Sequence, residues 1–326
     1  MPAAVTPMAA TLADRPPRGD EWIFEVKWDG VRALCFFEGE RMRIFSRNGN
    51  RCDAQYPELS VVPHYLAAER AILDGEIAVL DEKGISRFEL IQPRIANTDA
   101  NAVAHLGRSH PATLFVFDLI YLDGYDLRQC ELADRKRALE AIVTPGGVLR
   151  LSEHFTGDGE AVLEAAAQAG LEGVVAKRAR SCYEGRRSRE WLKLKLVNEQ
   201  EFLICGFTRG EREHFGALVL GAYEDGKLVW VGNVGTGFNQ RSMEALYRRM
   251  EPLMAAEPPF AARTPMPRQA TWLRPELVCM VKFANWTREN RLRAPVYLGP
   301  REDVDPREVR RERAAAPAAP RGVLLS

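Results

Sequence analysis

One lysine of this chain stands among residues that could make it a nucleophile. The segment Phe24–Arg32 (FEVKWDGVR) alternates apolar with charged residues and turns at Asp29-Gly30, which predicts a strand that ends near Lys27. A lysine amine that is partly removed from water loses its proton more readily and can bond covalently to a substrate. The alternative is a solvated lysine at a strand edge, so this interpretation depends on partners elsewhere in the chain.

Two later segments carry charges that suit such a lysine. The segment SRNG at 46–49 predicts a turn that presents Arg47 to a ligand. The segment LDGEI at 73–77 places the carboxylate of Glu76 between two apolar runs. Each segment taken alone also fits an ordinary turn, so neither decides the question by itself.

Three further segments read as strands with chemistry on one face. In FVFDL at 115–119, Phe115 and Phe117 share a face, which fits core packing or a platform for a purine base. The segment LEGVVAK at 171–177 carries Glu172 ahead of an apolar strand. In WLKLKL at 191–196, Lys193 and Lys195 share a face, which fits either an anion site or a solvated surface.

Length and composition exclude several classes of protein. The chain has 326 residues, of which 46% are hydrophobic, so it can bury two cores. Its formal net charge is zero, which argues against general polyanion binding by the whole molecule. The six cysteines form no CxxC pair, which argues against a zinc site or a disulfide framework and fits a reducing cytosol. We expect no membrane span and no signal peptide.

The elements that would position these residues fall into two series. Strands are predicted over 22–26, 33–37, 41–45, 71–80, 114–121, 174–177 and 191–196, with helices over 132–142 and 159–169. A second series of strands follows over 201–208, 216–223, 227–234 and 277–287, with one helix over 239–250. A Pro-rich stretch over 257–275 reads as a connecting loop. Short strands with one interposed helix are typical of an OB-type barrel.

The order of these motifs is more specific than any one of them. The series KxDG, SRNG, DGE, FDL, EGVVAK and WLKLK resembles that of the ATP-dependent DNA ligases, over about residues 20 to 305. Within that family, PMAATLA at 7–13 and WTRENRLRAP at 286–295 resemble the ligase domain of bacterial ligase D, an end-joining ligase. The resemblance implies an α+β fold: an adenylyltransferase domain of antiparallel sheets with flanking helices (1–197), an OB-fold β-barrel domain (198–312) and a disordered tail (313–326).

The resemblance also implies a mechanism and its residues. Lys27 would take AMP from ATP as a lysyl-AMP, pass it to the 5′-phosphate of a DNA nick, and release it when the 3′-hydroxyl seals the strand. Catalysis is expected from Lys27, Asp29, Arg32, Lys193 and Lys195. Nucleotide binding is expected from Glu25, Val26, Lys27, Arg32, Arg47, Glu76, Phe117, Val175, Lys193, Lys195 and Arg301. Phe117 is the expected adenine platform, with Val175 opposite, and Phe115 is the core-packing alternative.

Metal and DNA contacts follow from the same resemblance. Glu76 and Glu172 are the expected carboxylates for Mg²⁺ or Mn²⁺, which prefer oxygen ligands. Activation of Lys27 is expected from the metal, the lysine pair and desolvation, which disfavour the ammonium form. Eight basic residues against two acidic ones over 177–195 suggest a DNA-backbone contact or a solvated loop. The expected DNA contacts are Arg47, Arg186, Arg187, Arg288 and Arg293; the role of Arg291 is left open.

One motif departs from the family pattern. The last motif of the family reads RxDK, whereas Arg301-Glu302-Asp303-Val304 ends in valine. We expect Arg301, Asp303 and Arg307 to cover the role of the missing lysine, with a slower first step.

The resemblance leaves three functions open and suggests partners. The first is a DNA ligase in double-strand break repair, the second an RNA ligase or mRNA-capping-type nucleotidyltransferase, and the third a ligase-like domain that binds without chemistry. Nicked duplex DNA is the expected substrate. A Ku-type end-binding protein is an expected recruiting partner, because we expect no large DNA-binding domain ahead of Lys27. Separate polymerase or nuclease proteins are the other expected partners, because better-known ligase D proteins carry these activities fused to the ligase. We expect a monomer in the bacterial cytosol.

Overall fold

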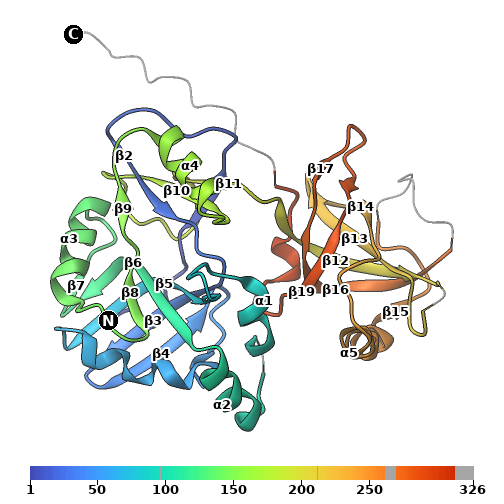
Figure 1. Ribbon diagram of the computed structural model, residues 1–326, viewed down its shortest axis with the longest axis horizontal. Helices are drawn as coiled ribbons and strands as arrows, with labels where there is room; N and C mark the ends of the chain where they lie inside the picture. Colours follow the sequence, from blue (N-terminus) through green and yellow to red (C-terminus); the bar gives the residue numbers. More distant parts are fainter. Residues whose placement is uncertain (96, 211, 261–268, 313–326) are drawn as a thin grey trace. The chain divides into compact units, whose positions relative to one another are not determined.

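The computed structural model describes residues 1–95, 97–210, 212–260 and 269–312 (Figure 1). These residues form two compact units. The first comprises Met1–Ile91 and Thr98–Leu196, and the second comprises Val197–Glu312 with the short segment Gln92–Asn97. Both contain antiparallel sheets and helices, so the predicted α+β class is confirmed. The predicted tail at 313–326 lies outside the described residues. Within the described ranges, no helix is long and apolar enough to cross a bilayer.

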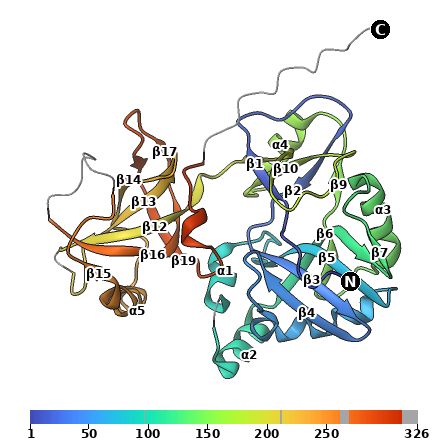
Figure 2. The same cartoon turned by 180° about the vertical axis from the view of Figure 1, so that it is seen from behind.

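One sheet of the first unit carries the lysine motif and has the strand order β1-β11-β10-β2-β9. Four of its strands, β1, β2, β9 and β10, are labelled in Figure 2. Its strands are β1 (Ala9–Leu12), β2 (Trp22–Val26), β9 (His154–Phe155), β10 (Gly173–Arg178) and β11 (Arg187–Lys195). Helix α4 (Gly159–Gln168) covers one face, where Trp22, Phe24, Val174, Ala176 and Leu194 are buried. Because side chains alternate along strands, the residues next to these on β2, β10 and β11, such as Glu25, Val175 and Lys193, project from the opposite face.

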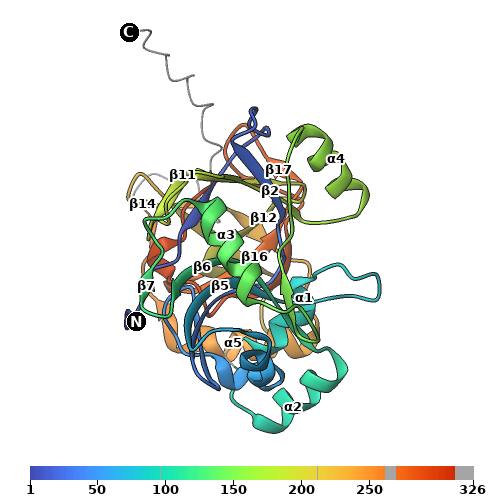
Figure 3. The ribbon, with the colours of Figure 1, turned by 90° about the vertical axis from the view of Figure 1, so that its left-hand side faces the viewer.

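The second sheet of this unit has the strand order β4-β3-β5-β6-β7, with β8 also paired to β6. Its strands are β3 (Val31–Glu38), β4 (Arg41–Ser46), β5 (Arg70–Val79), β6 (Ala112–Leu122), β7 (Tyr125–Asp126) and β8 (Leu149–Leu151). Helix α3 (Leu132–Ile142) packs against β6 (Figure 3). The unit also contains the α-helices α1 (Phe88–Ile91) and α2 (Ala100–Ser109) and the 3-10 helices η1 (Asp53–Gln55) and η2 (Pro57–Tyr65). Leu34 and Phe117 of this sheet share one buried cluster with Ile23 and Trp191 of the first sheet. The two sheets therefore face each other.

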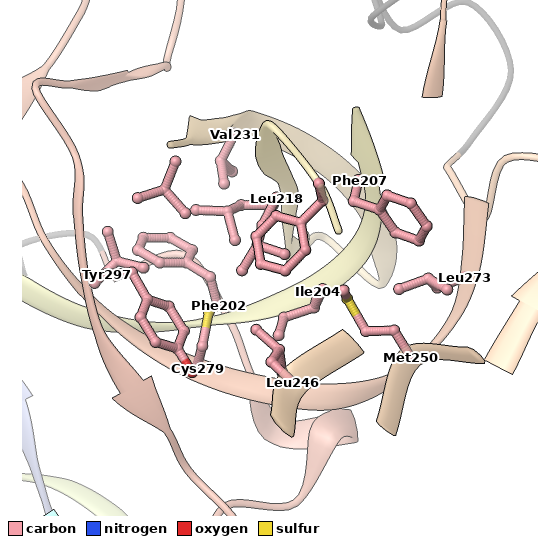
Figure 4. Close-up of a cluster of buried hydrophobic side chains, with 14 of the residues drawn as sticks. Phe202, Ile204, Phe207, Leu218, Val231, Leu246, Met250, Leu273, Cys279 and Tyr297 are labelled. Carbon is pink, nitrogen blue, oxygen red and sulfur yellow. The ribbon is translucent and has the colours of Figure 1, made fainter. Parts of the chain in front are cut away.

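The second unit is an OB-fold domain built on a six-stranded sheet. Strands β12 (Glu199–Thr208), β13 (Ala217–Glu224), β14 (Lys227–Val234), β15 (Met254–Ala255), β16 (Ala270–Lys282) and β19 (Val296–Pro300) form it, in the order β14-β13-β12-β16-β15 with β19 on β16. Helix α5 (Gln240–Met250) is interposed as predicted. Phe202, Leu218, Leu246 and Tyr297 point into its apolar core (Figure 4). A small hairpin joins β17 (Asn285–Trp286) to β18 (Leu292–Arg293).

Two predictions in the second unit are wrong in part. A loop is expected over 257–275, and residues 257–260 lie outside helices and strands, but β16 begins at Ala270 and contains Pro275; residues 261–268 lie outside the described residues. The strand accommodates this proline because its pairing with β12 shifts register there, between the Ile204–Leu277 and Gly206–Trp272 pairs, so that no ladder hydrogen bond from the proline is needed. The strand predicted over 277–287 ends at Lys282.

Candidate active site

Three strands bring the predicted site residues to one face of the first sheet. The register sets Glu25 opposite Val175, and Val175 opposite Lys193. Opposed residues of antiparallel strands point to the same side, as do residues two apart. The face turned away from α4 therefore carries Glu25, Lys27, Val175, Lys177, Lys193 and Lys195. Val26 has the opposite orientation and ends β2.

A glycine separates Lys27 from the lysine pair. Gly173 lies between Lys27 and Lys195, because the Lys27 N–H donates to the Gly173 carbonyl at 3.0 Å and Gly173 is paired with Lys195 across β10 and β11. A Cβ at position 173 would lie 2.1 Å from the Leu194 carbonyl oxygen, so only glycine fits. The row Lys27, Gly173, Lys195 thus has no side chain between its two amines.

Lys27 is paired with a carboxylate in this structure, and its activation by metal, by the lysine pair and by desolvation stays a prediction. Its ammonium forms an ion pair with Glu172, and the lysine side chain is 22% exposed. Burial lowers the pKa of Lys27, but the carboxylates of Glu172, Asp29 and Glu76 outweigh burial and raise that pKa above its ordinary value. The nearest charges are anionic, so desolvation alone does not produce a neutral amine.

Asp29 and Gly30 attach the lysine loop to the second sheet. The Asp29 carboxylate accepts a hydrogen bond from the Phe88 N–H at 2.9 Å, and the Asp29 N–H donates to the Ser86 hydroxyl at 3.0 Å. Burial and the charge of Glu172 raise the pKa of Asp29 to about 6, with Lys27 opposing. A Cβ on Gly30 would lie 2.2 Å from the Ile77 carbonyl oxygen, so the turn requires glycine.

The second sheet supplies the facing residues. Its register sets Arg32 opposite Glu76, and Glu76 opposite Phe115, so all three side chains point to the same side. Arg32 donates from Nε and Nη2 to Asp74 at 2.5 and 2.6 Å. Asp74 is fully buried and the Arg32 side chain is 21% exposed. The expected phosphate ligand thus already has a carboxylate partner, which the sequence did not predict.

The two phenylalanines of β6 have different surroundings. Phe117 is 7% exposed and belongs to the buried cluster between the sheets. The Arg32 guanidinium carbon and the Lys177 ammonium lie 4.7 and 4.2 Å from its ring centroid. Phe115, the core-packing alternative, stacks on Trp28 with centroids 3.6 Å apart. The adenine-stacking role of Phe117 therefore stays a prediction, and a base would have to displace one of these cations to reach its ring.

A buried triad of charges lies on the same face. Glu25 accepts hydrogen bonds from Lys136 at 2.8 Å and from Lys177 at 2.9 Å. Burial opposes ionisation of Glu25, but the two lysines outweigh it and hold the pKa of Glu25 below its usual value. Burial lowers the pKa of Lys177 to about 8. Sequence analysis missed Lys136, because nothing in the pattern of α3 marks one lysine of a charged helix as buried.

The carboxylates near Lys27 fit a divalent cation in part. Glu172 forms an ion pair with Lys27, and the charge of Glu76 adds to that of Glu172 in raising the pKa of Lys27. Across the described ranges, no group of three or more His, Cys, Asp or Glu side chains could hold a metal. Mg²⁺ is commonly held by one or two carboxylates together with substrate phosphates. The donors present therefore suit a cation that arrives with a nucleotide.

Comparison with known protein families identifies the family to which this chain belongs. A model described as "ATP dependent DNA ligase domain" matches residues 7–195, which is more than half of the chain. This chain belongs to the ATP-dependent DNA ligase family. A second model, "ATP dependent DNA ligase C terminal region", matches residues 211–304 of the ligase. These matches do not favour the RNA ligase or capping alternative.

Two relatives of this chain are named as end-joining proteins of bacteria. The chain is 39% identical to the multifunctional non-homologous end joining protein LigD of Pseudomonas aeruginosa, over 99% of this chain and 38% of that protein. It is 36% identical to LigD of Mycolicibacterium smegmatis, over 94% of this chain and 40% of that protein. The ligase thus spans about two fifths of the length of these relatives. A solved structure, mycobacterial DNA ligase D complexed with ATP and MES, matches with a TM-score of 0.65 and 34% identity, covering 94% of this chain and 98% of that one.

The arginines predicted to contact DNA are mostly exposed. Arg186 pairs with Glu184, and Arg187 donates to the Ala10 carbonyl at 2.6 Å. Arg288 and Arg293 are exposed on the β17–β18 hairpin and in its turn. Arg47 is half-buried in the predicted turn, where the Gly49 N–H donates to the Ser46 carbonyl at 2.9 Å.

Arg291 packs over the Trp230 ring, with its guanidinium carbon 4.1 Å from the ring centroid. Lys177 is buried, so the basic stretch at 177–195 is not one surface patch.

The last motif of the ligase is part of a core. Val304 is 7% exposed and packs in a buried cluster with Leu203 and Val278. Arg301 donates to the Asp303 carboxylate at 2.7 and 2.8 Å and lies 3.5 Å from Glu201. Arg307 is exposed and paired with Asp305. Val304 thus packs in an apolar core, and Arg301 is paired with Asp303 within the second unit.

Proposed function

We propose that this ligase seals nicks in duplex DNA that carry a 5′-phosphate and a 3′-hydroxyl, with Lys27 as the nucleophile. Three features support the proposal: Lys27 shares a sheet face with Lys193 and Lys195, the facing sheet carries Arg32, and the family match covers both units. The first unit would be the adenylyltransferase domain. In this proposal the second unit is an OB-fold domain that contacts DNA.

The first step joins AMP to the protein. The Lys27 amine gives up a proton and attacks the α-phosphorus of ATP, so that an N–P bond forms while the bond to pyrophosphate breaks. Lys193, Lys195 and Arg32 would stabilise negative charge on the phosphate oxygens, which is the main task in phosphoryl transfer. Glu25, on β2, precedes Lys27 and shares its face, and Val175 lies opposite Glu25 on β10, so both would line the nucleotide site; Val26 would contribute through its backbone, because its side chain points to the other face.

A divalent cation would change the charge balance at Lys27. Mg²⁺ or Mn²⁺ on Glu76 and Glu172 would neutralise the carboxylates that hold Lys27 charged, and would neutralise phosphate charge. Asp29 would keep the lysine loop in place through its hydrogen bonds to the segment that leads into α1. Arg301 would act at the nucleotide only after exchanging its partner Asp303.

The later steps use DNA. An oxygen of the 5′-phosphate attacks the lysyl-AMP and Lys27 leaves; the 3′-hydroxyl then attacks the activated 5′-phosphate and AMP leaves. Arg47, Arg186, Arg187, Arg288 and Arg293 would hold the phosphate backbone. We place the reaction in double-strand break repair, on the basis of the LigD relatives. The proposed partners are a Ku-type protein and separate polymerase or nuclease proteins. We place the protein in the cytosol as a monomer that associates with the nucleoid when it binds DNA. Its six free cysteines suit the reducing conditions of the cytosol.

Labelled nucleotide tests the proposal. Incubation with α-labelled ATP and Mg²⁺ is expected to label the protein, and addition of nicked DNA is expected to move the label to DNA and then to free AMP. Lys27→Ala should remove the label, whereas Lys83→Ala, an exposed lysine in the same unit, should keep it. A label that survives Lys27→Ala would refute Lys27 as the nucleophile. A label from GTP alone, or transfer only to nicked RNA, would move the chain to the capping or RNA ligase class.

A further inference from the structure

The segment PMAATLA at 7–13 has no role in the chemistry described so far. In the structure it runs beside the strand that carries the lysine pair. Strand β1 pairs with β11 in parallel, with Leu12 opposite Lys193. The Ala13 N–H then donates to the Lys193 carbonyl at 3.0 Å. The N-terminal segment therefore holds the backbone of β11 at Lys193.

The same segment closes a ring of hydrogen bonds around Arg32. The Met8 N–H donates to the Tyr183 hydroxyl at 3.0 Å, and that hydroxyl donates to Asp74 at 2.6 Å. Asp74 accepts two hydrogen bonds from Arg32, and Arg32 Nη2 donates to the Met8 carbonyl at 3.1 Å. The N–H and the carbonyl of Met8 thus both form hydrogen bonds within the ring. Met8, Arg32, Asp74 and Tyr183, which are distant in sequence, meet at the Arg32 guanidinium.

Burial makes this ring rigid. Met8 and Asp74 are fully buried and Tyr183 is nearly so, whereas Arg32 keeps some side-chain exposure. Hydrogen bonds to a buried carboxylate are strong. If one of them is lost, the carboxylate stays removed from water without compensation, and this destabilises the fold. Burial and the charge of Asp74 raise the pKa of Tyr183 well above its ordinary value, so the phenol stays protonated and donates. The Met8 sulfur also accepts from the Glu184 N–H at 3.3 Å, which anchors the segment further.

We propose that residues 7–13 are a positioning strap, which fixes Arg32 through Met8, Tyr183 and Asp74, and Lys193 through backbone pairing. The inference rests on the proposed function, because it takes Arg32 and Lys193 to act on phosphate. Tyr183 is then a positioning residue: it touches no substrate and acts through Arg32. Without these hydrogen bonds the Arg32 guanidinium could rotate away from the phosphate of ATP. A displacement of a fraction of an ångström is enough to slow the transfer of AMP to Lys27.

Tyr183→Phe removes only the hydroxyl of the ring. The rate of lysyl-AMP formation at saturating ATP is expected to fall about tenfold, equivalent to ~1.4 kcal/mol of activation free energy. Tyr121→Phe is the matched control, since Tyr121 belongs to the same buried cluster but lies outside the ring; it should keep the wild-type rate. Thermal unfolding of each variant separates loss of fold from loss of positioning.

A double-mutant cycle with Arg32→Lys separates positioning from general damage. If Tyr183 acts through Arg32, the double variant should be no slower than Arg32→Lys alone. Asp74→Asn, which keeps the shape of the side chain, serves as a second variant should Tyr183→Phe fail to fold, and the same non-additivity is expected. Additive effects, or a wild-type rate in a folded variant of either residue, would overturn the strap. Absence of lysyl-AMP in the wild-type protein would instead refute the proposed function.

Discussion

Replacing Asp29 by asparagine is expected to stabilise the fold while it slows lysyl-AMP formation. Burial and the negative charge of Glu172 raise the pKa of Asp29 from 3.8 to about 6, although the Lys27 ammonium opposes them. Ionising this carboxyl therefore costs more free energy in the folded protein than in the unfolded chain. Asparagine is neutral at every pH and can still accept the hydrogen bond from Phe88.

The sign and size of the effect follow from linkage. Because the folded pKa lies above the unfolded one, the favourable contribution of Asp29 is complete below about pH 4 and is lost as the pH rises through about 6. Two pKa units correspond to about 3 kcal/mol. Asp29 is half-buried, so solvent screening reduces the expected gain in the free energy of unfolding for Asp29→Asn to about 1–3 kcal/mol at pH 8.

Urea unfolding at pH 8 and at pH 4 measures this gain. Asp29→Asn should unfold at higher urea than the wild type at pH 8, and the difference should shrink at pH 4. Asp81→Asn is the control of opposite sign, because hydrogen bonds from the Ile85 N–H and Arg87 lower the pKa of Asp81. Equal stability of Asp29→Asn and wild type at pH 8, or a gain that does not depend on pH, would refute the reasoning.

Three further outcomes are expected. Val304→Lys buries an ammonium in an apolar cluster and should lower the melting temperature by about 10 °C or more without faster lysyl-AMP formation, which would count against the slower first step expected from the sequence; a faster first step would show that the missing lysine does limit that step. Asp118→Ala leaves Arg135 buried without its carboxylate, so the free energy of unfolding should fall by about 3–5 kcal/mol in urea titrations, and a loss below about 1 kcal/mol would contradict this. The double variant Arg288→Ala/Arg293→Ala should reduce the slope of log K against log salt for nicked DNA by about 2; an unchanged slope would exclude both as phosphate contacts.

Local patterns predicted most of the elements around the site. The strand at 22–26 and the helix at 132–142 have the bounds that periodicity predicted. In a half-buried strand or helix, the apolar residues recur with the period of the element, so the sequence shows where it begins and ends. The strand predicted at 191–196 begins earlier, at Arg187, since the polar start of β11 pairs with β1 through its backbone. Pairing through backbone hydrogen bonds does not require apolar side chains, so the pattern of hydrophobic residues does not reveal it.

Local patterns failed where a partner distant in sequence decides the outcome. Lys177 looks like the start of a basic surface stretch, yet it is buried against Glu25, 152 positions away. Arg32 looks like a phosphate ligand and is already bound to Asp74 on the neighbouring strand. Tyr183 sits among charged residues, and nothing in that sequence marks its hydroxyl as part of a buried ring.

The sequence by itself determined which reactive groups this ligase has and in what order they occur, because a motif series with that spacing already specifies the family. The tertiary structure alone decided that Lys27 is paired with Glu172, that Val304 lies in a core, and that an N-terminal segment reaches Arg32. The reason is physical. Charge state and orientation depend on desolvation and on Coulomb interactions, which act through space between groups that only the packing of distant strands brings together.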